Sequence, residues 1–286
     1  MKTVLITGTS TGFGNLAVPL YLERGWTVVA TMRKVAERGE QIFGKLKERF
    51  GDRLHLLELD VTVAEDRENA ASYIEEKLEG RLDVLVNNAG YGLMGTLEDQ
   101  TMEQLRLQFE VNFFGLAGLT RVLLPQLRRS RGRILNISSI GGLVTIPMFG
   151  SYNATKFAVE GLTEGLYYEL KPFGIQVGLI EPGGFKTDFV SRSLVVAKGA
   201  EDPSSPYANL NRPFLKLLKV RAERGDDPVK VAREIVRLSE IPHLPLRTLV
   251  GKDARLFAFL RRILPHDLRV GLTAWGFFKL LDRFRD

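Results

Sequence analysis

The sequence contains no cysteine and only three histidines among its 286 residues. Without cysteine there is no disulfide, no thiolate nucleophile and no cysteine-based metal site. The histidines His55, His243 and His266 lack the spacing of metal ligands, so we predict no metal site. No apolar run has the length of a membrane span, and the run after Met1 is too short for a signal peptide. We therefore expect the fold to begin at Met1 and the protein to be cytoplasmic, with membrane association as an alternative.

Positive charge is concentrated near the C-terminus. The net charge is +6, and the residues from Pro245 to Asp286 include nine basic and four acidic side chains. No recognisable nucleic-acid-binding module accompanies them, so we predict no nucleic-acid partner. The segment 254–286 places Leu, Phe and Trp between Arg residues, and Pro265 and Gly271 divide it. Three interpretations stay open: packing on its own domain or a partner subunit, covering a substrate mouth, or peripheral contact with an anionic membrane.

Short apolar strands alternate with helical segments along most of the chain. Strands are predicted at 3–7, 27–31, 54–59, 82–86, 133–137, 175–180 and 246–251, and helices at 13–24, 36–50, 64–79, 101–129, 152–170 and 228–240. Strands that are apolar on both faces form a parallel sheet covered on both sides. We predict an α/β fold, a doubly wound parallel sheet of the Rossmann type with helices on both faces, as one domain over 1–286. Residues 185–225 show no clear period, which favours a substrate loop or lid, and 254–286 form a helical extension.

A glycine-rich turn, TGTSTGFG at 7–14, joins the first strand to the first helix. A pyrophosphate at such a helix N-terminus meets free backbone N–H groups and the positive end of the helix dipole. Three residues separate the first two glycines, so the spacing differs from G-x-G-x-x-G. By itself the turn is also compatible with a tight connection that binds nothing.

Tyr152 and Lys156 lie four residues apart on a predicted helix and therefore share a face. Hydride exchange at an alcohol or carbonyl carbon requires a proton to move at the oxygen. The ordinary pKa of tyrosine, near 10, is high for this task, and we expect the Lys156 ammonium to lower the pKa of Tyr152. Ser139 follows the preceding strand and can hold the substrate oxygen.

Five motifs in this order resemble the short-chain dehydrogenase/reductase family over roughly residues 2–190. They are TGTSTGFG (7–14), Asp60 in LDV, NNAG (87–90), SSIGGLVTIPMFGSYNATK (138–156) and PGGFKT (182–187). The resemblance implies that Ser139, Tyr152 and Lys156 are catalytic and that Asn112 completes a tetrad. It further implies that Asp60 lies by the adenine, Asn87 near the adenosine ribose, and Thr187 and Pro182–Gly183 at the nicotinamide. The predicted dinucleotide contacts are Gly8, Ser10, Thr11, Gly12, Phe13, Gly14, Arg33, Asp60, Val61, Asn87, Ala89, Gly90, Tyr152, Lys156, Pro182, Gly183 and Thr187.

The second strand indicates which dinucleotide binds. Family members that prefer NAD carry an acidic residue at its end, whereas here the strand runs into Arg33 and Lys34. Two cations suit a 2′-phosphate, so we predict NADP with Arg33 as its contact, and NAD as the alternative.

The substrate is predicted less sharply than the reaction. The ATMR, SxGGLxxxP and KFAVEG stretches are similar to the steroid- and retinol-dehydrogenase branch, which implies a hydrophobic alcohol or ketone. Two alternatives remain: a dinucleotide-sensing regulator without catalysis, and a reductase of carrier-bound 3-oxoacyl groups. The family also suggests a homo-oligomer built on the helices at 101–129 and 152–170.

Overall fold

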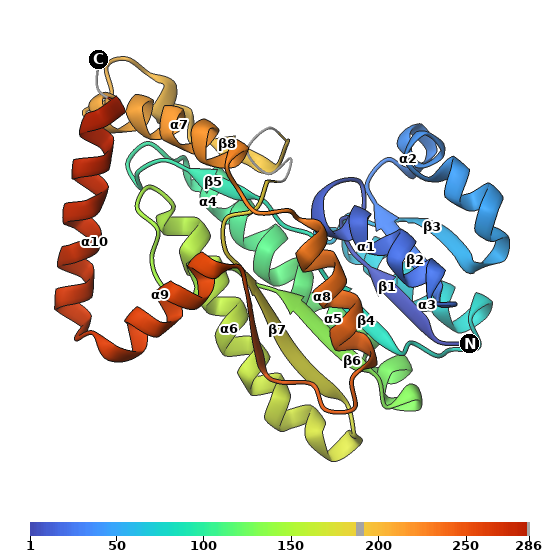
Figure 1. The fold of residues 1–286 in the computed structure, drawn as a ribbon. Coiled ribbons are helices and arrows are strands. Elements are labelled where there is room, and N and C mark those ends of the chain that lie inside the picture. Colours follow the sequence, from blue (N-terminus) through green and yellow to red (C-terminus); the bar gives the residue numbers. More distant parts are fainter. Residues whose placement is uncertain (187–191, 285–286) are drawn as a thin grey trace.

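The computed structural model describes residues 1–186 and 192–284, and its centre is a parallel sheet. In the described residues this sheet has seven strands in the order β3-β2-β1-β4-β6-β7-β9 (Figure 1). In chain order the strands are β1 (Thr3–Ile6), β2 (Thr27–Met32), β3 (Leu54–Glu58), β4 (Val84–Asn87), β6 (Arg133–Ile137), β7 (Gln176–Pro182) and β9 (Arg247–Val250). The strand order reverses beside β1, which makes the fold doubly wound, as predicted.

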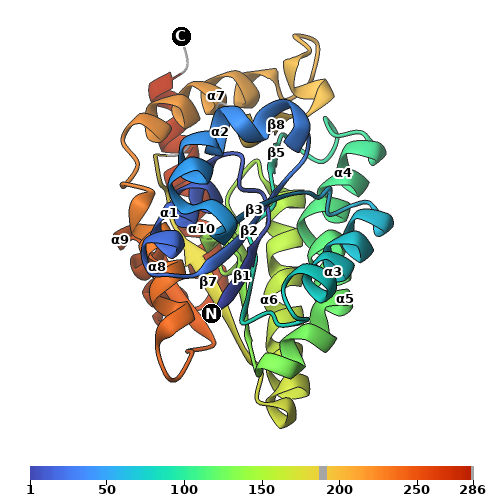
Figure 2. The same cartoon turned by 90° about the vertical axis from the view of Figure 1, so that its right-hand side faces the viewer.

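Helices cover both faces of the sheet (Figure 2). One face carries α1 (Gly12–Glu23), α2 (Val35–Phe50) and α8 (Val229–Glu240), and the other carries α3 (Ala64–Lys77), α5 (Gly115–Ser130) and α6 (Gly150–Leu170). Successive β1 residues point to opposite sides, so Val4 and Ile6 join the first core while Leu5 joins the second. Burial on both faces explains why the strands are continuously apolar.

The carboxyl ends of the parallel strands meet at one edge of the sheet. The glycine-rich turn follows β1, Arg33 follows β2, Asp60 follows β3 and Ser139 follows β6. In an open α/β sheet this edge, at the reversal of strand order, is where ligands bind. The fold therefore gathers residues that lie far apart in the sequence.

The predicted single helix at 101–129 is interrupted. It consists of α4 (Met102–Phe109), a π-helical turn (Glu110–Phe114) and α5. Thr101 caps α4 by accepting from Gln104 N, while the Gln104 side chain accepts from Thr101 N. The wider turn places Asn112 inside the protein, where it is 1% exposed.

Residues 185–225 are more regular than the predicted loop. They include β8 (Leu194–Val196) and α7 (Ala208–Glu223), and β8 pairs with β5 (Gly92–Met94) in a small parallel sheet. Strands of three residues are too short to show a period, and Pro213 inside α7 obscures the helical pattern. The expectation of a substrate loop or lid for this segment stays a prediction.

The C-terminal extension forms two helices, α9 (Lys252–Ile263) and α10 (His266–Leu281), and α10 stands at the edge of the molecule (Figure 1). Pro265 separates them, whereas Gly271 lies inside α10 and does not end a helix, contrary to expectation. Among the described residues, no helix combines the length and apolar character needed to cross a membrane.

Candidate functional site

The glycine-rich turn fits closely against the end of β4. A Cβ atom on Gly8 would lie 2.9 Å from Ala89 Cα, and one on Gly14 would lie 2.6 Å from Asn88 Nδ2. Gly8 and Gly12 also have positive φ angles of 67° and 64°. Gly8 is therefore needed for both space and backbone conformation, Gly12 for conformation and Gly14 for space.

Hydrogen bonds from Asn88 hold this turn in place. Its Nδ2 donates to Thr7 O at 2.8 Å and to Gly8 O at 3.1 Å, and Thr7 Oγ1 accepts from the backbone N of Asn88 and of Ala89. Neither Thr7 nor Asn88 was predicted as a site residue. The repeated asparagine in NNAG was the available signal, because a second amide beside a turn can satisfy its carbonyls.

A cleft of about 580 Å³ opens at the N-terminus of α1. Ser10, Thr11 and Gly12 line one part of it, and Lys186 and Arg192 line another. Backbone N–H groups at a helix N-terminus and nearby cations together attract an anion. Of these residues, the predicted set missed Lys186 and Arg192.

The structure brings Ser139, Tyr152 and Lys156 together at the carboxyl end of β6. The hydroxyl of Tyr152 forms a hydrogen bond with Ser139, and Lys156 Nζ lies 5.7 Å from the centre of the Tyr152 ring. Lys156 Nζ also donates to Ile137 O at 2.9 Å. Residues from β6 and α6 thus converge on one phenol.

The pKa of Tyr152 differs from the expectation. Burial raises the pKa of Tyr152 above its ordinary value of 10.0, and the hydrogen bond with Ser139 only partly opposes this. Burial also lowers the pKa of Lys156 to about 8, although the nearby Glu160 carboxylate acts in the opposite direction. The expected net lowering of the Tyr152 pKa is therefore wrong for the protein alone, because burial is the largest influence on that pKa.

Asn112 lies beside these residues in the π-helical turn. Its Nδ2 donates to Tyr91 O at 2.9 Å and to Thr155 Oγ1 at 3.2 Å, and its Oδ1 accepts from Tyr91 N. A Cβ on Gly90 would lie 3.1 Å from Asn112 Oδ1 and 3.9 Å from Lys156 Nζ. Gly90 therefore leaves the space through which Asn112 and Lys156 approach one another.

Arg33 lies near Asp60, beyond the ends of β2 and β3. Its Nη1 is 3.9 Å from Asp60 Oδ2, and its side chain is 74% exposed. Glu58, which was not predicted, accepts from Lys34 N at 2.5 Å and from Val35 N at 2.6 Å. Its carboxylate thus satisfies the first N–H groups of α2 and leaves the Arg33 guanidinium directed to solvent.

Other predicted contacts are mainly structural in this arrangement. Asn87 is buried, and its Nδ2 donates to Thr120 Oγ1 at 3.0 Å and to Asn136 Oδ1 at 2.8 Å. Val61 is buried against Gly115. Their contacts with a dinucleotide stay predictions.

The end of β7 is held by an unpredicted side chain. Asp253 Oδ2 accepts from Gly184 N at 2.7 Å, and a Cβ on Gly183 would collide with the same carboxylate. Phe13 packs edge-to-face on Phe185 at 5.8 Å, which joins the first turn to this strand end. Thr187 lies outside the described residues.

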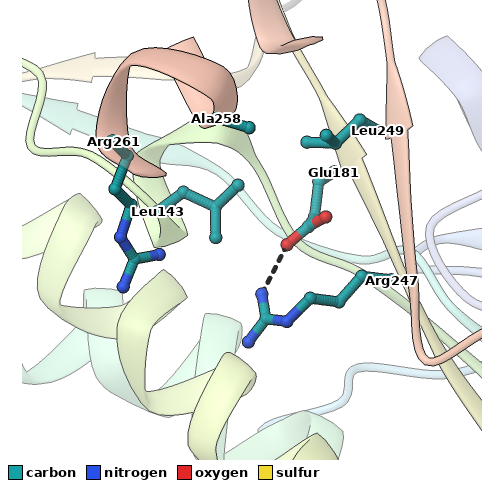
Figure 3. A pocket seen from close by; sticks show the side chains of 6 residues that line it. All are labelled: Leu143, Glu181, Arg247, Leu249, Ala258 and Arg261. Atoms are coloured by element: carbon teal, nitrogen blue, oxygen red, sulfur yellow. Dashed lines mark hydrogen bonds and ion pairs between the residues drawn. The ribbon is translucent and has the colours of Figure 1, made fainter. Parts of the chain in front are cut away.

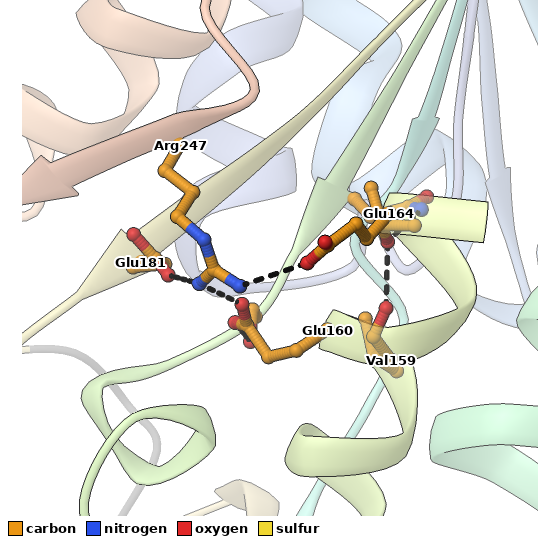
Figure 4. Close-up of polar contacts among 8 residues, drawn as sticks. Val159, Glu160, Glu164, Glu181 and Arg247 are labelled. Carbon is orange, nitrogen blue, oxygen red and sulfur yellow. Dashed lines mark hydrogen bonds and ion pairs between the residues drawn. The ribbon is translucent and has the colours of Figure 1, made fainter. Parts of the chain in front are cut away.

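A cluster of charges, in which Glu160 and Glu181 are buried, extends from α6 to β9 (Figure 4). Arg247 pairs with Glu160 and with Glu181 Oε1, the latter at 2.7 Å, and its Nη2 lies 3.9 Å from Glu164. Burial and repulsion from Glu160 raise the pKa of Glu181, and Arg247 opposes this. Ser138 donates to Glu160, one helical turn beyond Lys156.

A cavity of about 350 Å³ borders this cluster (Figure 3). It is lined by Leu143, Glu181, Arg247, Leu249, Ala258 and Arg261. Its apolar walls come partly from α9, and Ser139, Tyr152 and Lys156 do not line it. We assign it no role in the chemistry.

Similarity to known proteins agrees with this geometry. A family model described as short chain dehydrogenase matches residues 2–194. The chain belongs to this family. It is an oxidoreductase by family, and a nicotinamide dinucleotide is the cofactor that its structural neighbours support.

Two relatives illustrate the range of substrates. A 3-ketodihydrosphingosine reductase from Bacteroides thetaiotaomicron is 37% identical over 270 residues, covering 93% of this chain and 94% of the relative. Human retinol dehydrogenase 8 is 36% identical over 256 residues, covering 86% and 80%. The predicted likeness to the retinol dehydrogenase branch is therefore confirmed.

Two solved structures share the fold. A short-chain dehydrogenase from Streptomyces avermitilis superposes with a TM-score of 0.80 at 37% identity, covering 96% of this chain and 97% of the other. An alcohol dehydrogenase from Thermococcus sibiricus, complexed with 5-hydroxy-NADP, gives 0.70 at 26% identity, covering 87% and 96%.

Gly14→Ala should destabilise the protein by about 1–3 kcal/mol and weaken dinucleotide binding, because the new Cβ displaces the Asn88 amide. Gly161→Ala is the matched control, since it lies in helix α6 with no neighbouring atom within 4 Å of its added Cβ. Alanine there should be neutral or stabilising. Urea denaturation and dinucleotide titration measure both effects, and equal behaviour of the two variants would contradict the close approach at Gly14.

Arg247→Ala should destabilise the protein by about 2 kcal/mol at pH 7.5, because it leaves the buried Glu160 and Glu181 carboxylates together without their cation. This value is reduced for solvent screening, since the Arg247 side chain is 38% exposed. The loss should be smaller at pH 5.5. The folded protein raises the pKa of Glu181, so protonation relieves the repulsion, and stability falls as the pH rises through that raised pKa.

Arg237→Ala removes an exposed pair with Glu234 on α8 and serves as control, with an expected loss below about 1 kcal/mol at both pH values. Urea denaturation at the two pH values tests the difference. A loss for Arg247→Ala that does not change with pH would show that Glu181 titration is not coupled to Arg247.

Proposed function

We propose that this protein is an NADP-dependent reductase that converts the carbonyl group of a hydrophobic, chain-like substrate into an alcohol, with Tyr152 as the proton donor. One observation carries the proposal: Tyr152 stands where a polar site meets an apolar cluster. Its hydroxyl bonds to Ser139, while its ring packs at 5.8 Å against Phe149. Phe149 is 5% exposed and continues into a cluster formed with Met94, Phe214, Leu217 and Leu281.

The site residues fit a dinucleotide. The cleft lined by Ser10, Thr11 and Gly12 at the N-terminus of α1 would accept the pyrophosphate, because backbone N–H groups at a helix N-terminus bind anions. Arg33 would bind the 2′-phosphate, and Pro182–Gly183 with Thr187 would contact the nicotinamide. The bound cofactor supplies the hydride.

The protein's own side chains manage the proton. Because burial raises the pKa of Tyr152, its phenol stays protonated at neutral pH and can donate that proton to the substrate oxygen. Ser139 hydrogen-bonds the same oxygen, and Lys156 holds a positive charge nearby. A protonated Tyr152 suits the reduction that we propose.

The substrates named for the relatives support the proposal that this protein acts on a hydrophobic substrate. 3-Ketodihydrosphingosine and retinol both join a long apolar chain to a small polar end, which suits an apolar cluster that ends at Tyr152 and Ser139. A carrier-bound 3-oxoacyl group stays an alternative substrate. The dinucleotide-sensing alternative would require binding without turnover.

Tyr152→Phe should reduce turnover by roughly a hundredfold to ten-thousandfold while dinucleotide binding is retained, because only the proton donor is lost. NADPH oxidation with a long-chain ketone measures the rate, and fluorescence titration measures binding. Tyr168→Phe, on the same helix and 64% exposed, is the control. Retention of most activity in Tyr152→Phe would contradict the assignment. A wild-type protein that binds NADPH but reduces neither free nor carrier-bound ketones would favour the sensor.

Arg33→Ala should weaken NADPH binding by roughly tenfold to a hundredfold and leave NADH binding nearly unchanged, since only NADPH carries the 2′-phosphate. Lys45→Ala, an exposed cation on α2, controls for a general change in charge. Equal losses for the two dinucleotides would show that Arg33 does not read the phosphate.

A further inference from the structure

Helices α9 and α10 carry an unusual concentration of exposed apolar side chains. They span about a tenth of the chain, yet they hold nine of the nineteen exposed large apolar residues that the described residues contain. These nine are 43–63% exposed: Leu256, Phe257, Phe259, Ile263, Leu268, Val270, Leu272, Trp275 and Phe278. Only Ala254 and Leu281 are buried in the two helices. Such a patch usually marks an interaction site.

The exposed residues follow helical spacing. Leu256, Phe259 and Ile263 form one stripe on α9, and Leu268, Leu272 and Trp275 form another on α10. The opposite side of α10 is also apolar, because Phe277 and Leu281 pack with α7. A helix that only covers its own domain has a polar outer face, so the outward stripe requires a separate explanation.

The charge around these stripes is mainly positive. Residues 252–284 include seven basic and three acidic side chains, and the exposed Arg255 and Arg262 flank the α9 stripe. Lys279 Nζ lies 4.6 Å from the centre of the Trp275 ring. One of the acids, Asp253, is engaged by the backbone N of Gly184 and Ala254. Two copies of this face would bring their cations together, whereas an anionic surface would be attracted.

We propose that α9 and α10 form a docking face for membranes that contain anionic lipid, with both helices in the plane of the interface. Neither helix is long and apolar enough to cross a membrane. Apolar stripes with basic flanks and an exposed Trp are the features by which helices bind at the boundary between headgroups and acyl chains.

The docking face is connected to the reacting tyrosine. Phe277 on α10 packs at 5.7 Å against Phe214 on α7, Phe214 at 5.9 Å against Phe149, and Phe149 at 5.8 Å against Tyr152. A chain-like lipid entering between α7 and α10 would therefore meet apolar side chains as far as Tyr152. This consequence for substrate delivery rests on the proposed function, whereas the docking itself does not.

Vesicle binding by the full chain tests the proposal. We expect flotation with phosphatidylcholine vesicles that contain roughly one third phosphatidylglycerol, and much weaker binding to phosphatidylcholine alone or at high salt. Tryptophan emission should shift to the blue on binding, because Trp275 is 63% exposed and Trp26 is already buried.

Matched variants separate the apolar and the electrostatic contributions to membrane binding. Phe259→Glu combined with Trp275→Glu should abolish flotation, whereas Leu97→Glu, at an even more exposed apolar position away from α9 and α10, should not. Arg255→Glu with Arg262→Glu should weaken binding by at least about 25-fold, since each basic residue near the surface contributes on the order of fivefold. Lys45→Glu with Arg106→Glu, at exposed sites on α2 and α4, is the charge control.

Absence of wild-type flotation, or equal binding to neutral and anionic vesicles, would overturn the proposal. A second result would also overturn it: the wild type is a dimer that does not float, and Phe259→Glu with Trp275→Glu converts this dimer to a monomer. The face would then be a subunit contact. Dinucleotide binding and ketone reduction in vesicle-free buffer report on folding and on the proposed function separately. A variant that no longer floats but keeps dinucleotide binding and ketone reduction is defective in membrane docking alone.

Discussion

The hydrogen bond from Lys156 Nζ to the carbonyl of Ile137 ties α6 to the carboxyl end of β6, and the geometry of the site follows from it. It fixes the face of α6 that carries Tyr152 one turn before Lys156, so the phenol meets Ser139 just beyond the same strand. The bond also determines the electrostatics. A lysine held this far from water has its pKa lowered to about 8, yet most of its charge persists at neutral pH.

Charges of alternating sign continue from Lys156 through α6 to β9. Glu160 raises the pKa of Lys156, Arg247 pairs with Glu160, and Glu181 lies on the other side of Arg247. Buried carboxylates of this kind are costly unless each has a partner, so the row links α6 to β9, after which α9 begins. The C-terminal helices are thereby connected to the site through β9 as well as through the aromatic contacts of α7 and α10.

Sequence patterns predicted the sheet and the proximity of Tyr152 and Lys156 because both depend on local signals, whereas Asn112 was expected only from the family resemblance. Apolar strands, a glycine-rich turn and the spacing of Tyr152 and Lys156 are visible in any short window of the chain. Glu58, Asp253 and Asn88 were not predicted, because each acts on a backbone group far away in the sequence or across a turn. Helix α7 was hidden by Pro213, and the three-residue strands β5 and β8 exist only through their pairing.

The pKa of Tyr152 depends on burial, which the sequence spacing does not reveal. The spacing of Tyr152 and Lys156 suggested a cation that lowers the phenol's pKa, but spacing carries no information about burial. In the folded protein the apolar ring of Phe149 and the surrounding cluster remove water from Tyr152, and burial becomes the largest influence on its pKa. The same apolar surroundings suit a hydrophobic substrate and keep the proton on Tyr152. The desolvation of the site by residues of α7 and α10 that pack around it therefore underlies both the raised pKa of Tyr152 and the hydrophobic substrate proposed above.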